Sequence, residues 1–263
     1  MIKLIATDLD GTLLLPGGIL PQEIFKIIDS LYARGTIFAV ASGRQYESLK
    51  KLFAPAADKV LFIAENGALV IYKDKLLFSD FLPKNRLADI FAALQSERNA
   101  YPLLCCADYA YAKDDFAPFL EECTKYYPHF KKINSRTPVQ EKNSVCKVAV
   151  FDPHGAAENS GKNLAKKLPD LRVIVSGNVW SDISMPETNK GNALLFVQKY
   201  FHLQKEECAA FGDYMNDLEM LLVCGQSFVP ENGFPVLKER IKNVIPSNAE
   251  NGVVQKIREL TKI

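Results

Sequence analysis

The first twelve residues constrain the fold more than any other stretch of the chain. An apolar run over residues 2–6 stops at Asp8 and Asp10, which are followed by Gly11. A run this short, ended by a turn residue, predicts a strand of a parallel sheet that is buried on both faces. Ligands of open α/β sheets bind beyond the carboxyl ends of the strands, so a substrate should reach both aspartates. Their spacing lets both carboxylates bind one cation, although two such acids can also simply end a strand and cap the next turn.

A second apolar run, over residues 36–41, ends at Ser42, Gly43 and Arg44. Between the two runs, apolar residues recur at helical spacing from 24 to 31, so the order is strand, helix, strand. This order implies a right-handed crossover and a parallel sheet, which brings Ser42 to the same edge as Asp8. A hydroxyl and an unhindered backbone N–H suit a phosphate oxygen. Ser42 can equally be an ordinary helix N-cap.

The middle of the chain predicts a hairpin followed by a separate domain. Residues 60–64 and 68–72 are strand-like and enclose Asn66-Gly67, which indicates a hairpin. From about residue 79 to 186, three amphipathic helices and several strand-like runs predict a separate, smaller α/β domain. None of its strands ends in a carboxylate pair, so its expected role is to cover the site and discriminate between substrates. Candidate lining residues are Tyr109, Trp180 and Asp182.

The last quarter of the chain returns to polar residues at the ends of apolar runs. Lys190 precedes a helix with apolar residues at 194–201, where a lysine can neutralise both an aspartate and a phosphate, or can be an ordinary surface residue. The strand-like run 208–211 stops before Asp213 and Asp217. Crowded carboxylates repel one another unless a cation or ligand compensates them. Because the ligands are hard oxygens, the pattern favours Mg²⁺ over zinc.

Composition excludes several other classes. The formal net charge is +1 and no basic cluster is present, which argues against a nucleic-acid surface. No apolar run approaches the ~20 residues of a membrane span, and the N-terminus lacks the pattern of a signal peptide. Six scattered cysteines without a Cys-x-x-Cys pair predict reduced thiols, and the three histidines follow no metal-ligand spacing. We therefore expect a cytoplasmic protein without a membrane partner, and nothing in the sequence points to a protein partner.

Four ordered motifs resemble those of the haloacid-dehalogenase-like hydrolases. They are Asp8-Leu9-Asp10-Gly11-Thr12, Ser42-Gly43-Arg44, Lys190-Gly191 and Gly212-Asp213-Tyr214-Met215-Asn216-Asp217. The long insertion resembles the large α/β cap of the Cof-type branch, whose members are mostly magnesium-dependent phosphatases of small phosphorylated metabolites. The resemblance implies a Rossmann-like core over residues 1–80 and 187–263, with an inserted cap over 81–186 that selects the substrate. Residues 227–233 depart from the family's Met-Gly-Asn-Ala pattern, though Asn232 keeps the asparagine.

The resemblance also implies a role for each residue of the motifs. Asp8 would form an aspartyl-phosphate, and Asp10 would be the general acid and base. Mg²⁺ would be held by Asp8, the backbone carbonyl of Asp10 and Asp213, with Asp217 orienting the metal shell. The groups expected to hold phosphate oxygens are Ser42, the Gly43 N–H, Lys190 and Asn216. Arg44 would either reach the substrate or pair with an acid.

Three other functions remain open from the sequence. A phosphoryl transferase or mutase would use the same nucleophile. A metal-dependent glycosyltransferase would use Asp8 and Asp10 to hold a nucleotide-sugar diphosphate, but it has no need of Lys190 or Asp213. A non-catalytic binding protein could keep the fold. However, both predicted catalytic aspartates, Asp8 and Asp10, are present, so the sequence does not predict a loss of activity.

Overall fold

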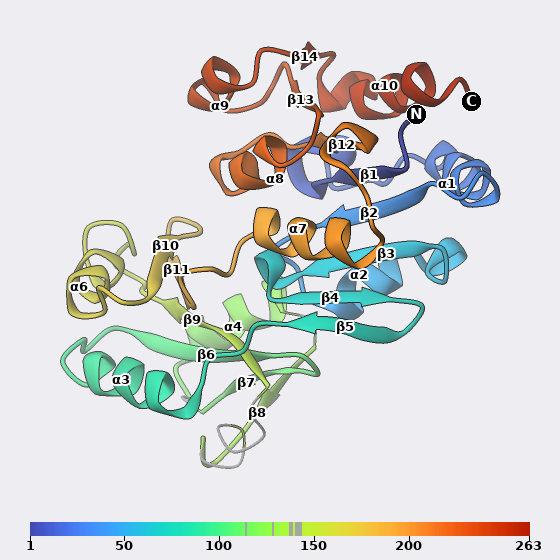
Figure 1. Ribbon diagram of the computed structural model, residues 1–263. Helices are drawn as coiled ribbons and strands as arrows, with labels where there is room; N and C mark the ends of the chain where they lie inside the picture. The colour runs from blue at the N-terminus through green and yellow to red at the C-terminus, as the bar shows by residue number, and fades with distance from the viewer. Residues whose placement is uncertain (114, 128, 137–138, 140–143) are drawn as a thin grey trace. The chain divides into compact units, whose positions relative to one another are not determined.

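The structure is a computed structural model that describes residues 1–113, 115–127, 129–136, 139 and 144–263 (Figure 1). The chain forms two compact units, one made of Met1–Phe78 with Asn189–Ile263 and the other of Ser79–Thr188. The first unit thus combines both ends of the chain, and the second is inserted between them.

The first unit is built on an eight-stranded sheet in the order β14-β13-β12-β1-β2-β3-β4-β5. Neighbours from β14 to β3 are parallel, and β4 runs antiparallel to β3. The strands are β1 (Leu4–Thr7), β2 (Ile37–Ala41), β3 (Val60–Ala64), β4 (Leu69–Tyr72), β5 (Lys75–Ser79), β12 (Cys208–Phe211), β13 (Gln226–Pro230) and β14 (Val244–Ile245). The predicted α/β fold with a parallel-sheet core is confirmed.

Helices cover both faces of this sheet. They are α1 (Glu23–Ala33), α2 (Tyr46–Leu52), α7 (Lys190–Tyr200), α8 (Leu218–Leu222), α9 (Pro235–Arg240) and α10 (Gly252–Thr261). On one face, α7, α8 and α9 pack against alternate strand residues such as Ala39 and Leu61. On the other face, Phe53 at the end of α2 packs against Phe38 and Phe62. Strands buried on both sides explain why each reads as an unbroken apolar run.

The hairpin predicted around Asn66-Gly67 is formed by β3 and β4. Its last pair is Ala64 with Leu69, so four residues connect the strands. Glu65 and Asn66 both adopt left-handed backbone conformations, with φ of 51° and 57°. The Asn66 N–H donates to the Ser42 carbonyl at 3.0 Å, outside the hairpin. This bond ties the connection to the loop after β2.

The second unit has a six-stranded sheet in the order β10-β11-β9-β6-β7-β8, antiparallel except for the β7–β8 pair. Its strands are β6 (Tyr101–Cys106), β7 (Ala110–Ala112), β8 (Phe130–Lys132), β9 (Val145–Phe151), β10 (Arg172–Val175) and β11 (Trp180–Ser184). Its helices include α3 (Lys84–Leu94), α4 (Ala117–Tyr126) and α6 (Ser160–Lys167). Apolar side chains of α3 and α6 pack on one face and those of α4 on the other.

The register of the first unit brings several strand ends together. Thr7, the last residue of β1, is paired with Phe211 of β12 and with Val40 of β2. The segments that follow these three strands therefore start at one edge of the sheet, as parallel strands require.

Among the helices that the structure describes, none is long and apolar enough to cross a bilayer.

Candidate active site

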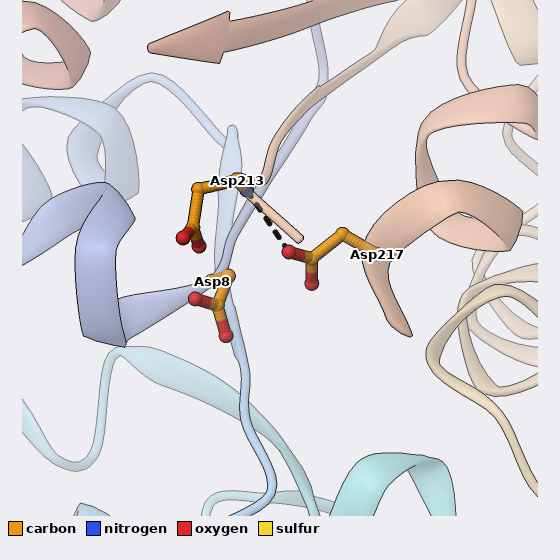
Figure 2. A group of neighbouring side chains, drawn as sticks. All are labelled: Asp8, Asp213 and Asp217. Atoms are coloured by element: carbon orange, nitrogen blue, oxygen red, sulfur yellow. Dashed lines mark hydrogen bonds between the residues drawn. The ribbon is translucent and has the colours of Figure 1, made fainter. Parts of the chain in front are cut away.

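Three aspartates from distant parts of the chain converge at this edge. Asp8 follows β1, and its N–H donates to the Phe211 carbonyl of β12 at 2.9 Å. Asp213 follows β12, and Asp217 ends the short 3₁₀ helix Met215–Asp217. One carboxylate oxygen of each aspartate lies within 4.8 Å of the other two. Figure 2 shows the three side chains next to one another, with the carboxylates of Asp213 and Asp217 directed toward Asp8.

Lys190, the first residue of α7, neutralises part of this charge. Its Nζ lies 2.5 Å from Asp8 Oδ1 and 2.6 Å from Asp217 Oδ1, and its side chain is only 1% exposed. Three ionised carboxylates and one ammonium leave two negative charges, which one divalent cation would balance. The charge and the hard oxygen ligands thus fit Mg²⁺.

Hydrogen bonds fix the other oxygens of two aspartates. Asp217 Oδ2 accepts from the N–H groups of Asp213 and Tyr214, at 3.0 and 3.1 Å. Asp213 Oδ1 accepts from the Thr12 hydroxyl at 2.8 Å. Both oxygens of Asp217 are therefore engaged, whereas Asp8 Oδ2 and Asp213 Oδ2 are not held by these bonds. The two latter oxygens are the better placed to bind a metal ion directly.

The ionisation of the cluster follows from its burial. Burial raises the pKa of Asp8 to about 8; the Lys190 ammonium opposes this rise, and the Asp217 charge adds to it. Burial also raises the pKa of Asp213, again with a contribution from Asp217. For Lys190, burial alone would lower the pKa, but the carboxylates of Asp217 and Asp8 outweigh it and the pKa is raised. The protein alone therefore favours a proton on Asp8, and a bound cation would favour its release.

Gly11 allows the loop after β1 to approach Asp213. Its φ is +80°, and a Cβ atom there would lie 2.4 Å from Asp213 Oδ2. A side chain at this position would strain the backbone and displace the carboxylate. Residue 11, which directly follows Asp10, must therefore be glycine.

Asp10 and Arg44 form an ion pair next to this cluster. Arg44 Nε donates to Asp10 Oδ2 at 2.9 Å and Nη2 to Asp10 Oδ1 at 2.5 Å. The Asp10 side chain is 59% exposed, so its carboxylate is the accessible one among the predicted catalytic acids. Of the two roles that the sequence left open for Arg44, pairing with an acid is the one observed in this structure.

The residues expected to bind phosphate lie on neighbouring segments. Ser42 is buried, and its Oγ accepts from the Arg44 N–H at 3.2 Å. It is not the N-cap of α2, which begins at Tyr46 after Gln45. Asn216 donates through Nδ2 to Asn66 Oδ1 at 3.3 Å. The side chain of Asn66 also lies against Gly43, where an added Cβ would be 3.1 Å from the Asn66 amide.

Sequence reasoning assigned no role to three residues that support the site. They are Thr12, Asn66 and Asn232. Asn232 Nδ2 donates to the Gly11 carbonyl at 2.7 Å, and its Oδ1 accepts from the Asn248 N–H at 2.9 Å. Each of the three lies in a motif or strand-end segment that the sequence had singled out. That position was the only feature of the sequence that pointed to a role at the site.

The three candidate lining residues of the second unit make contacts within that unit. Trp180 packs against Phe151, with ring centroids 5.4 Å apart. Asp182 is buried and pairs with Lys147 at 3.2 Å. The Tyr109 ring lies under the Lys131 ammonium. Each of the three side chains thus has a partner inside the second unit.

Comparison with known proteins agrees with this geometry. Residues 5–257 match the family of haloacid dehalogenase-like hydrolases. The chain is 29% identical to the 5-amino-6-(5-phospho-D-ribitylamino)uracil phosphatase YbjI of Escherichia coli, over 99% of this chain and 97% of that protein. It is 26% identical to the HMP-PP phosphatase of Cronobacter sakazakii, over 90% and 87%. The crystal structure of SMU.1108c from Streptococcus mutans matches with a TM-score of 0.87 and 27% identity, covering both chains fully.

The chain therefore belongs to the haloacid dehalogenase-like hydrolases. Within that family it is a Cof-type phosphatase, and its reaction class is phosphoric monoester hydrolysis. The resemblance found in the four motifs is confirmed.

Proposed function

We propose that the chain is a Mg²⁺-dependent phosphatase that hydrolyses a phosphomonoester of a small metabolite through an aspartyl-phosphate on Asp8. The observation that carries this proposal is the cluster of Asp8, Asp213, Asp217 and Lys190, whose net charge of two negative units matches one divalent ion. Asp8, Asp213 and the backbone carbonyl of Asp10 would hold the metal. Asp217 would orient the surrounding shell, because its own oxygens already bind Lys190 and two N–H groups.

Asp8 is the nucleophile in this proposal. Its carboxylate would attack phosphorus, and the bond from phosphorus to the leaving-group oxygen would break as the new bond forms. When bound, Mg²⁺ would keep Asp8 ionised and screen its charge from the phosphate. Lys190 fixes Oδ1 of Asp8 through the 2.5 Å contact, which limits rotation of the carboxylate.

Asp10 is the proton carrier in this proposal. In its protonated form it would protonate the leaving alkoxide in the first step and so become a carboxylate. In the second step that carboxylate would take a proton from the attacking water as the bond between Asp8 and phosphorus breaks, which releases inorganic phosphate. Its exposure suits a group that must meet substrate and water in turn. Arg44 holds both of its oxygens, so the ion pair would orient Asp10 and must loosen before the proton moves. A second role of Arg44 toward the substrate remains part of the proposal.

Phosphate oxygens would be held by Ser42, the Gly43 N–H, Lys190 and Asn216. Support comes from their position, because these residues follow β2, begin α7 and follow β12 in the unit that carries Asp8. We assign catalysis to this unit and substrate selection to residues 79–188. The substrate class is proposed from the relatives, which are named as phosphatases of a ribitylaminouracil phosphate and of HMP-PP.

The test is hydrolysis of p-nitrophenyl phosphate with Mg²⁺ and with EDTA, using the wild-type protein and Asp8→Asn. We expect activity only with Mg²⁺ and a loss of at least ~10³-fold in kcat for Asp8→Asn, since the variant removes the nucleophile. The matched control is Asp29→Asn, which removes an exposed carboxylate paired with Lys59. Hydrolysis that survives Asp8→Asn undiminished would refute the nucleophile assignment.

A second experiment addresses the substrate. A panel of sugar phosphates, 5-amino-6-(5-phospho-D-ribitylamino)uracil and HMP-PP would be ranked by kcat/KM, the ratio in which discrimination is expressed. Release of inorganic phosphate to water distinguishes a phosphatase from a transferase or mutase, which would pass the phosphoryl group to an added alcohol or sugar. Predominant transfer would overturn the hydrolase proposal.

A further inference from the structure

The turn between β3 and β4 has an unusual backbone for its sequence. Glu65, Asn66 and Gly67 all have positive φ, at 51°, 57° and 104°. Asparagine and glycine tolerate the left-handed region, whereas glutamate rarely adopts it. Such conformations persist where surrounding contacts over-determine them, and they cluster at functional sites. The contacts of this turn show what determines it.

Backbone hydrogen bonds tie the turn to the loop after β2. The Glu65 N–H donates to the Arg44 carbonyl at 3.1 Å, and the Asn66 N–H donates to the Ser42 carbonyl at 3.0 Å. The side chain of Asn66 lies flat against Gly43, where a Cβ would be 3.1 Å from both Oδ1 and Nδ2 of Asn66. The turn therefore holds the Ser42–Arg44 segment at three successive residues.

The same turn touches the other two segments expected to bind phosphate. Asn66 Oδ1 accepts from Asn216 Nδ2 at 3.3 Å. A Cβ on Gly67 would lie 2.3 Å from the Asn189 carbonyl and 3.1 Å from the Lys190 backbone nitrogen, so the turn packs directly on the start of α7. Three segments that are far apart in the chain thus meet at Asn66 and Gly67.

We propose that Asn66 is a positioning residue for phosphate binding, which acts by orienting the carboxamide of Asn216. This inference rests on the proposed function. An amide oxygen can only accept, so the bond from Asn216 selects the orientation in which Nδ2 faces Asn66. The second N–H of that nitrogen then remains available as a donor to a phosphate oxygen. Packing against Gly43 fixes the plane of the Asn66 amide itself.

The test variant is Asn66→Gly, because glycine keeps the left-handed backbone and removes only the side chain. We expect the KM for p-nitrophenyl phosphate and the dissociation constant of inorganic phosphate to rise about tenfold, with kcat changed less than about threefold. The control is Lys73→Gly, which makes the same change at another left-handed residue, at the opposite end of β4 (φ 52°). It should leave both constants unchanged.

A double-mutant cycle separates positioning from a general structural effect. If Asn66 acts through Asn216, adding Asn66→Gly to Asn216→Ala should weaken phosphate binding less than about twofold further. The proposal would be overturned if the two substitutions weakened phosphate binding by factors that multiply in the double variant. It would also be overturned if Asn66→Gly left KM and phosphate affinity unchanged, as Lys73→Gly should. Gly43→Ala provides a second route, because its Cβ must displace the Asn66 amide and should raise KM less in the Asn66→Gly background than in the wild type.

Phosphate affinity, measured by calorimetry with inorganic phosphate and Mg²⁺, does not require turnover. A wild-type protein that binds phosphate but hydrolyses nothing would refute the proposed function and still allow Asn66 to be tested. A wild-type protein that neither hydrolyses p-nitrophenyl phosphate nor binds inorganic phosphate would refute both.

Discussion

Lys190→Met tests the charge arrangement of the site most directly. The ammonium is 1% exposed and lies 2.5 Å from Asp8 and 2.6 Å from Asp217. Methionine is apolar and similarly flexible, so the variant removes the charge and the two hydrogen bonds while filling part of the space. The site would then hold three carboxylates without an internal cation.

The expected loss follows from burial. Breaking a buried ion pair by removing one partner costs about 3–5 kcal/mol, because the remaining charge is buried without compensation. Asp8 can reduce this cost near pH 7, because its pKa is already raised to about 8 and would rise further without Lys190. Asp217, whose side chain is 1% exposed, would then be the main uncompensated group. We therefore expect about 3 kcal/mol, which corresponds to a fall in Tm of roughly 6–12 °C for a unit of this size.

The assay is thermal and urea unfolding followed by circular dichroism, in EDTA at pH 7. Lys3→Met is the matched control, because Lys3 lies 2.6 Å from Glu207 but its side chain is 52% exposed. An exposed pair of the same length contributes little, since water and salt screen it. If Lys190→Met loses no more stability than Lys3→Met, the buried cluster does not depend on Lys190 and the reasoning is wrong.

Three further predictions concern the metal and the loop around it. Mg²⁺ at a hundred times its Kd should stabilise the wild-type protein by about 2.7 kcal/mol, and Asp213→Asn should abolish this gain in a Tm titration. In EDTA, the folded protein keeps a proton on Asp8 that the unfolded chain loses, because folding raises the pKa of Asp8 to about 8. The Asp8 contribution to stability should therefore be fully present below about pH 4 and be lost as the pH rises to about 8. Asp8→Asn should remove this contribution from a plot of Tm against pH. Gly11→Ala should lower kcat/KM at least ~100-fold and eliminate stabilisation by Mg²⁺, because its Cβ would lie 2.4 Å from Asp213 Oδ2; full activity would contradict the close approach.

The parallel core and the polar residues at its strand ends could be predicted from sequence. Strands buried on both faces read as continuous apolar runs, and right-handed crossovers fix the edge at which they end. The register that pairs Thr7 with Phe211 and Val40 shows why this reasoning succeeds. Both aspartates after β12 follow a strand adjacent to β1, so topology alone brings them to Asp8.

Side-chain partners at the site could not be predicted in the same way. The sequence spacing allowed Asp8 and Asp10 to share a cation, but the Asp10 carboxylate is bound by Arg44. The chain leaves the strand conformation directly after Asp8, in an irregular helical segment over Leu9–Leu13 that is interrupted at Asp10 and Gly11. The alternation of a strand therefore no longer governs where the Asp8 and Asp10 side chains point. Whether Arg44 meets an acid or the substrate depends on this loop, which periodicity does not specify.

The role of Asp217 also depends on contacts that only the structure reveals. Its position one helical turn after Asp213 made it a candidate metal ligand, yet one oxygen binds Lys190 and the other binds two N–H groups of its own loop. Asp217 therefore holds the ammonium that in turn holds Asp8. An Asp217→Asn variant should accordingly weaken Lys190 as a partner of Asp8, and a loss of activity in that variant would not by itself identify Asp217 as a metal ligand. Only the loss of Mg²⁺ affinity at a pH where Asp8 remains ionised would do so.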